Sequence, residues 1–118
     1  MRLSDSEWKI ADCLWKNESM TITELTKELS PVTGWNKNTI ITLLKRMADK
    51  GAVDYVQEDR AKRFHTTIDR TEAELEETDS FLDKVYKGNV GLMISNLIGS
   101  DRLSDEELEE LRRIIREG

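Results

Sequence analysis

One stretch of the chain decides the fold: residues 35–51, which read WNKNTIITLLKRMADKG. Asn36 has the side chain of a helix N-cap, and Gly51 is the residue type that ends helices. Between them, apolar residues recur at the three- and four-residue spacing of a buried helix face: Ile40, Leu43, Leu44 and Met47. The stretch therefore predicts an amphipathic helix with one face in a core.

The opposite face of this helix begins with hydrogen-bonding side chains and ends with cations; it comprises Asn38, Thr39, Ile41, Thr42, Lys45 and Arg46. A helix in the DNA major groove needs this order, because its first residues meet base edges and later ones meet phosphates. For Arg46 the pattern also allows a surface ion pair with Asp49 or Asp12. Thr39 and Thr42 could instead bond to carbonyls of their own helix.

Helix starts elsewhere are marked by Ser or Thr followed three residues later by Glu, the capping-box pattern: Ser4…Glu7, Thr21…Glu24, Thr71…Glu74 and Ser104…Glu107. These starts predict helices near 5–16, 22–30, 72–87 and 105–117. A further helix is expected over 89–98. Residues 30–34 (SPVTG) carry turn residues, so we expect them to link the second and third helices.

After Gly51 the apolar period changes from that of a helix to that of a strand. Val53 and Tyr55 alternate with polar neighbours, residues 58–61 form a polar turn, and 62–67 return with β-branched and aromatic side chains. This pattern predicts a β-hairpin. Three helices followed by a hairpin make a winged helix-turn-helix, so we expect a mainly α chain with a small β wing.

We place the winged-helix domain at residues 1–70 and a three-helix dimerisation region at 71–118. Cations are concentrated at the turn of the hairpin, where they would sit on the wing: Arg60, Lys62 and Arg63. A solvated hairpin tip without a partner is the alternative for these three residues.

Charge is distributed unevenly along the chain, whose net charge is −6. Residues 1–70 hold 12 Lys and Arg against 11 Asp and Glu, a net +1, whereas residues 71–118 hold 6 against 13, a net −7. Within the first part, residues 35–70 carry 8 against 5, a net +3. Attraction to DNA would therefore be local, with the acidic half facing away from the polyanion.

The C-terminal 48 residues carry much apolar surface for their length. Segments of this size rarely hold an independent core, and burial against a second copy is the common solution. Folding back onto the N-terminal domain is the alternative. The side chains expected in a dimer interface are Phe81, Leu82, Val85, Met93, Leu97, Leu108, Leu111 and Ile115.

Several classes of protein are not expected from the composition. The chain has one Cys and one His, so we expect neither a disulfide nor a metal site; Cys13 fits a buried thiol. The N-terminus turns polar at once and no apolar run is long enough for a bilayer, which favours a cytoplasmic location. Phosphate loops and catalytic constellations are lacking, so we expect no enzyme and no cofactor.

The sequence resembles the BlaI/MecI/CopY penicillinase-repressor family. The resemblance rests on collinear segments: Leu3–Trp8 with Leu14-Trp15, Trp35–Ile40, Thr42–Arg46 with Lys50–Ala52, Phe81-Leu82 with Val85–Gly88, and Leu103–Arg112. It extends over about residues 3–117. It implies a homodimeric repressor in which each winged-helix domain binds half of a palindromic operator.

In the family the third helix contacts bases and the wing contacts the DNA backbone. Thr39, Thr42 and Arg46 match the residues typical of the family, whereas Lys37 and Asn38 stand where many members have Pro and Lys. The operator sequence therefore stays open. Together with the pattern above, the expected DNA contacts are Lys37, Asn38, Thr39, Thr42, Lys45, Arg46, Arg60, Lys62 and Arg63.

The resemblance also suggests how repression would end. The penicillinase branch is relieved by proteolysis after a membrane sensor protease detects a β-lactam, and the matching place here is Asn96-Leu97. Ordinary helix sequence is the alternative for that pair. The copper-responsive branch carries Cys-x-Cys motifs, and one Cys cannot supply such soft ligands. Two other functions stay open: a winged-helix adapter for protein partners, and a repressor gated by a small molecule.

Overall fold

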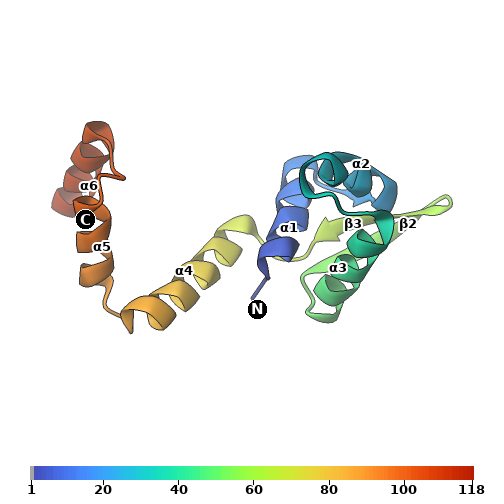
Figure 1. Cartoon of the computed structure of the whole chain (residues 1–118), viewed down its shortest axis with the longest axis horizontal. Helices are drawn as coiled ribbons and strands as arrows, with labels where there is room; N and C mark the ends of the chain where they lie inside the picture. Colours follow the sequence, from blue (N-terminus) through green and yellow to red (C-terminus); the bar gives the residue numbers. More distant parts are fainter. Residues whose placement is uncertain (1) are drawn as a thin grey trace. The chain divides into compact units, whose positions relative to one another are not determined.

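The computed structural model describes residues 2–118, which form two compact units, one that ends at Glu77 and one that comprises Thr78–Gly118 (Figure 1). In chain order the elements are α1 (Asp5–Asn17), β1 (Met20–Thr21), α2 (Ile22–Thr33), α3 (Lys37–Asp49), β2 (Val53–Glu58), β3 (Ala61–Thr66), α4 (Arg70–Tyr86), α5 (Val90–Gly99) and α6 (Asp105–Glu117). The helix-rich chain with a small sheet confirms the expected fold class.

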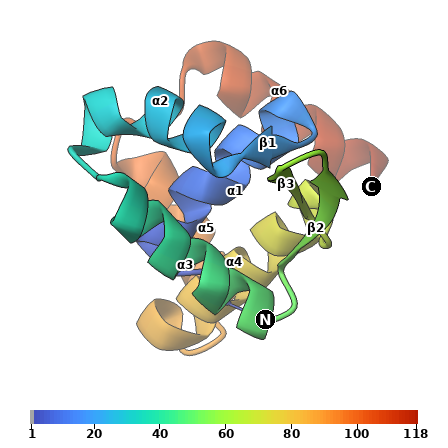
Figure 2. The same cartoon turned by 90° about the vertical axis from the view of Figure 1, so that its right-hand side faces the viewer.

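The first unit packs α1, α2 and α3 around one core, with the β2–β3 hairpin beside them (Figure 2). The expected apolar face of α3 is buried: Ile40 and Met47 are fully inaccessible, and Leu43 and Leu44 nearly so. Cys13 is buried too, as expected, and its burial raises the pKa of the thiol.

The tryptophans lie at the margin of this core. Trp8, Trp15 and Trp35 are half-buried and pack against the buried cluster. The indole Nε1 of Trp15 donates a hydrogen bond of 3.1 Å to the carbonyl of Ile68, so the end of the hairpin is fastened to α1.

The hairpin forms where the period-two pattern predicts it. Strands β2 and β3 pair antiparallel with Tyr55 opposite Phe64. A short third strand, β1, adds to the outer side of β3 with Met20 opposite Phe64. Two residues are too few to show a period, so the sequence did not predict β1.

Three of the four expected capping boxes are confirmed. Ser4, Thr21 and Ser104 each accept the backbone N–H of the residue three positions on, and the Glu there accepts the N–H of the cap. The fourth prediction is wrong: α4 begins at Arg70, so Thr71 lies inside the helix.

The expected turn over residues 30–34 is also wrong, because α2 continues through Pro31 to Thr33. Proline has no backbone N–H, so the helical hydrogen bond to the Lys27 carbonyl is missing at this position. Local bonds hold the last turn: the Thr33 hydroxyl donates to the Leu29 carbonyl and accepts the N–H of Trp35. Gly34 then ends the helix in the left-handed conformation, with φ of 74°.

The second unit contains α5, α6 and the end of α4. Many of its apolar side chains are exposed, among them Phe81, Val85, Leu92, Leu97 and Ile115. Within residues 2–118, every helix is too short or too polar to cross a bilayer.

Candidate nucleic-acid interface

The outer face of α3 presents the polar and cationic side chains that the sequence predicts. Asn36 caps the helix by accepting the N–H of Thr39 at 3.0 Å, which fixes the direction in which the helix starts. Since the apolar stripe anchors the opposite face, the remaining side chains face outward. The exposed ones are Lys37, Asn38, Thr42, Lys45 and Arg46; Thr39 is half-buried.

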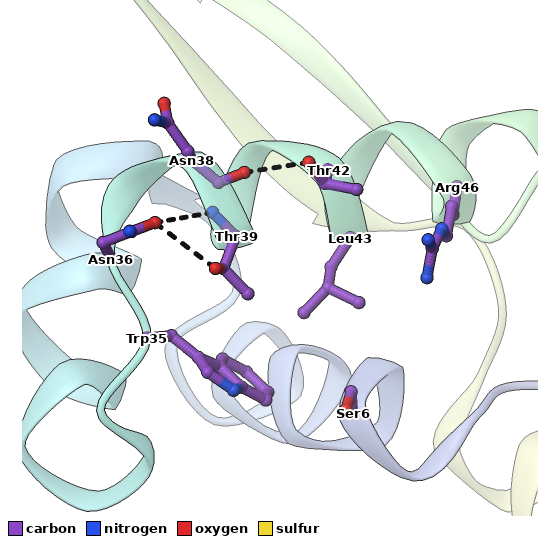
Figure 3. Close-up of a pocket in the computed structure, with 8 residues that line it drawn as sticks. All are labelled: Ser6, Trp35, Asn36, Asn38, Thr39, Thr42, Leu43 and Arg46. Carbon is purple, nitrogen blue, oxygen red and sulfur yellow. Dashed lines mark hydrogen bonds between the residues drawn. The ribbon is translucent and has the colours of Figure 1, made fainter.

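Arg46 lies at the edge of a shallow hollow of about 440 Å³ beside the first turn of α1 (Figure 3). Ser6, Trp35 and Leu43 are among the residues around it. None of its lining residues in the described part of the chain is a carboxylate. Asp12, one of the alternative partners of Arg46, is instead paired with Arg70 at 2.9 Å. The guanidinium of Arg46 is thus accessible to a ligand.

Both threonine hydroxyls on α3 make local bonds, but only Thr42 bonds to a carbonyl of its own helix as the alternative interpretation expected. Thr42 Oγ1 donates to the Asn38 carbonyl at 3.0 Å, and Thr39 Oγ1 donates to Asn36 Oδ1 at 3.3 Å (Figure 3). A hydroxyl oxygen that donates its proton in one hydrogen bond can still accept another hydrogen bond. In this conformation the two threonines offer acceptor oxygens and methyl groups outward.

The three cations of the wing have different surroundings. Arg60 is exposed at the turn, and the ammonium of Lys62 lies 4.5 Å from the centre of the Tyr55 ring. Arg63 turns inward: its guanidinium pairs with Glu24 at 3.1 Å and donates to the Ser19 carbonyl at 3.1 Å. Arg63 therefore ties the hairpin to the start of α2.

A second hollow, of about 410 Å³, lies where the starts of α2 and α3 meet the wing. It brings together Lys37, Arg60 and Lys62, which are far apart in the sequence. Lys45 is exposed on α3 but belongs to neither hollow.

Sequence reasoning missed one pair that supports the interface. Glu7 is 1% exposed, and its Oε1 accepts from the ammonium of Lys50 at the end of α3. Burial raises the pKa of Glu7, but the hydrogen bonds from Lys50 and Ser4 outweigh it and hold the pKa below its ordinary value. The capping pattern identified Glu7, but nothing local in the sequence indicated Lys50 as its partner.

The residues expected in the dimer interface lie on the three C-terminal helices. Exposed members are Phe81, Val85, Leu97 and Ile115; half-buried members are Leu82, Met93, Leu108 and Leu111. Asn96 is exposed on α5, and its Nδ2 donates to Tyr86 Oη at 3.4 Å.

A three-helix core, a capped third helix with a polar outer face and a β wing together define a winged helix-turn-helix domain. Residues 3–117 match the family model described as penicillinase repressor. The chain therefore belongs to the penicillinase repressor family, whose members are transcriptional repressors rather than enzymes.

Individual relatives agree with this assignment. The penicillinase repressor of Bacillus licheniformis is 34% identical over 116 residues, which cover 98% of this chain and 91% of the relative. The methicillin resistance regulatory protein MecI of Mammaliicoccus sciuri is 26% identical over 113 residues, which cover 96% of this chain and 92% of the relative.

This chain is also similar to a solved structure of B. licheniformis BlaI. That structure holds the monomeric form in complex with the blaP half-operator. It superposes with a TM-score of 0.55 at 33% identity and covers 61% of this chain and 88% of the BlaI chain.

Proposed function

We propose that this chain is a homodimeric transcriptional repressor that binds a palindromic operator in double-stranded DNA. The observation that carries the proposal is the outer face of α3, where Thr42 and Arg46 are exposed while the opposite face is buried. The family assignment and the half-operator complex of the BlaI relative support it. Such a protein acts where the DNA is, in the cytoplasm.

In this proposal the N-terminal residues of α3 meet base edges. Asn38 can pair with adenine, and the acceptor oxygens of Thr39 and Thr42 suit the amino groups of adenine and cytosine. Arg46 contacts a guanine or a phosphate, and Lys45 contacts the backbone. Arg60 and Lys62 contact the backbone from the wing, and Arg63 contributes by holding the wing in place.

We propose that residues 78–118 join two chains through their exposed apolar side chains. Phe81, Val85, Leu97 and Ile115 are between 42% and 75% exposed in the single chain. Burying such side chains is favourable by about 25 cal/mol per Å². Engagement of two half-sites by one dimer multiplies the affinity of each domain.

For the release of repression we propose proteolysis at Asn96-Leu97 by a membrane sensor protease, as the family resemblance suggests. Asn96 is exposed but lies within α5. Cleavage there would require α5 to unwind locally.

The test is binding to the DNA upstream of the gene for this chain, measured by footprinting and fluorescence anisotropy. We expect the wild-type chain to protect two symmetric half-sites. Thr42→Glu places a carboxylate on the groove-facing side of α3 and should abolish protection. Thr71→Glu, at an exposed position on α4, is the matched control. If Thr42→Glu bound the fragment as tightly as Thr71→Glu, the proposed function would be wrong.

A further inference from the structure

Three cations from separate elements converge on the hollow between the wing and the starts of α2 and α3. Lys37 comes from the first residue of α3, Arg60 from the hairpin turn and Lys62 from β3. The remaining lining residues are Thr21, Ile22, Thr23, Gln57 and Ala61. No carboxylate lines this hollow in the part of the chain that the structure describes, so the positive charge there is not compensated by its lining.

Neighbouring contacts set the position of the wing. Lys62 is steadied by the Tyr55 ring, and the Gln57 amide donates to the Ala61 carbonyl at 3.2 Å, which closes the turn. Arg63 is occupied by Glu24 and Glu58, both outside the lining. In the part of the chain that the structure describes, neither Lys37 nor Lys62 pairs with a carboxylate, and the Tyr55 ring leaves the ammonium of Lys62 able to bind an anion as well.

We infer that this hollow binds one phosphate group of the DNA backbone, shared by Lys37, Lys62 and Arg60. The inference rests on the proposed function and adds a site to it. A tetrahedral anion suits several converging donors, because each oxygen accepts independently. The hollow also lies between α3 and the wing, the two elements proposed to touch the duplex, so a backbone segment crossing from one to the other passes over it. Free inorganic phosphate is the other source of the same chemistry.

The experiment uses the full chain and the footprinted duplex, with a scrambled duplex beside it. The variants are Lys37→Gln, Lys62→Gln and a triple variant that adds Arg60→Gln, which remove the charge and keep a polar side chain. Lys9→Gln is the control at an exposed position on α1. Affinity is measured across salt concentrations. Each neutralised phosphate contributes about 0.9 to the slope of log K against log salt.

A shared phosphate predicts that the triple variant lowers the magnitude of this slope by about 0.9 per chain, or about 1.8 for a dimer on two half-sites, because one phosphate contact per chain disappears. Contacts with two or three separate phosphates in each hollow would lower it by at least about 1.8 per chain, or about 3.6 for the dimer, and would contradict the inference. The loss should be equal on both duplexes, since phosphate contacts carry no base information. An unchanged slope would also overturn the inference, and the proposed function would survive if the wild-type chain still protected its operator.

A second arm separates the two sources of phosphate. Inorganic phosphate is titrated into isotope-labelled wild-type chain and the amide signals of Thr23 and Lys37 are followed by NMR. Saturation at low millimolar phosphate, together with duplex binding that is indifferent to both lysines, would assign the hollow to the free ion and overturn the inference. If the wild-type chain bound no duplex at all, both the proposed function and the DNA phosphate site would be wrong.

Discussion

Glu7 shows how one buried charge joins two helices. It is the one charged side chain that is buried within residues 2–118, and its partner Lys50 is partly exposed. Lys50 also donates to the Arg2 carbonyl at 2.9 Å. Since Lys50 directly follows α3, the pair fixes the end of the proposed DNA-contacting helix against the start of α1.

Replacing Glu7 by Gln should destabilise the fold by about 2 kcal/mol at pH 7, the usual worth of a hydrogen bond to a charged group. Folding lowers the pKa of Glu7 below its unfolded value of 4.5. The stabilisation is therefore complete above about pH 5 and is lost as pH falls through the lower, folded pKa. Urea unfolding at pH 7 and pH 3 measures both effects.

Glu107→Gln is the matched control, because Glu107 also closes a capping box but is exposed. At pH 7 this substitution should lower the free energy of unfolding by less than Glu7→Gln does. A Glu7→Gln deficit that was equally large at pH 3 would mean that the charge of Glu7 is not what stabilises the fold.

Arg46 is the residue on which sequence specificity should depend most. Arg46→Ala should weaken operator binding by about 1–3 kcal/mol and reduce the preference over scrambled DNA, as loss of a bidentate base contact does. Fluorescence anisotropy on both duplexes measures the change. Arg112→Ala, at an exposed position on α6, should bind as the wild type does. An equal loss on both duplexes would identify Arg46 as a phosphate contact instead.

At the scale of elements, the sequence predicted the features that depend on residues close together in the chain, such as helix faces and helix starts. The face of α3 followed from the spacing of Ile40 and Met47, and three helix starts followed from Ser or Thr paired with Glu. It failed where neighbours outweigh local preference, because Pro31 is held in a helix by the bonds of Thr33 and Gly34. The strand β1 depends on pairing with β3, which no local pattern contains.

The candidate site was predictable residue by residue but not as an arrangement. The polar face of α3 followed from helical spacing. The meeting of Lys37 with Lys62, and the inward turn of Arg63 toward Glu24, depend on how the hairpin packs against α2 and α3. Such long-range juxtapositions carry no signal in a single sequence.

The wing should loosen when Arg63 is replaced. Arg63→Ala removes the ion pair with Glu24 and the bond to Ser19, partly exposed contacts worth about 1 kcal/mol together. Hydrogen exchange of the β2 and β3 amides should speed up, while exchange in α5 and α6 stays unchanged. Arg60→Ala, at the exposed turn of the same hairpin, is the control and should leave hairpin exchange near the wild-type rate. Equal exchange in all three proteins would show that Arg63 does not hold the wing.

At the scale of the whole molecule, charge and exposed apolar surface are distributed unevenly between residues 1–70 and residues 71–118. The net charge is +1 over residues 1–70 and −7 over residues 71–118. We expect the cations near α3 and the wing to attract DNA locally, and the apolar helix faces of the acidic half to join two chains. Ile114 and Ile115 are 52% and 75% exposed although α6 is otherwise strongly charged, which favours burial against a partner copy.

Leu97→Asp should turn dimers into monomers, because it places a charge in the proposed apolar interface. Ser95→Asp introduces the same charge two residues away on the same helix and is the control. Both positions are exposed in the single chain, so neither change should unfold it. Sedimentation velocity at micromolar concentration distinguishes the dimer from the monomer. If Leu97→Asp remained as dimeric as Ser95→Asp, α5 would not belong to the interface.

The central claim is that two copies present a pair of α3 helices to successive major grooves, about 34 Å apart. Sedimentation of the wild-type chain with the full footprinted duplex, and with a duplex cut to one half-site, tests it most directly. We expect two chains on the full site, bound cooperatively, and much weaker binding to the half-site. One chain on the full site, held no more tightly than on the half-site, would contradict it.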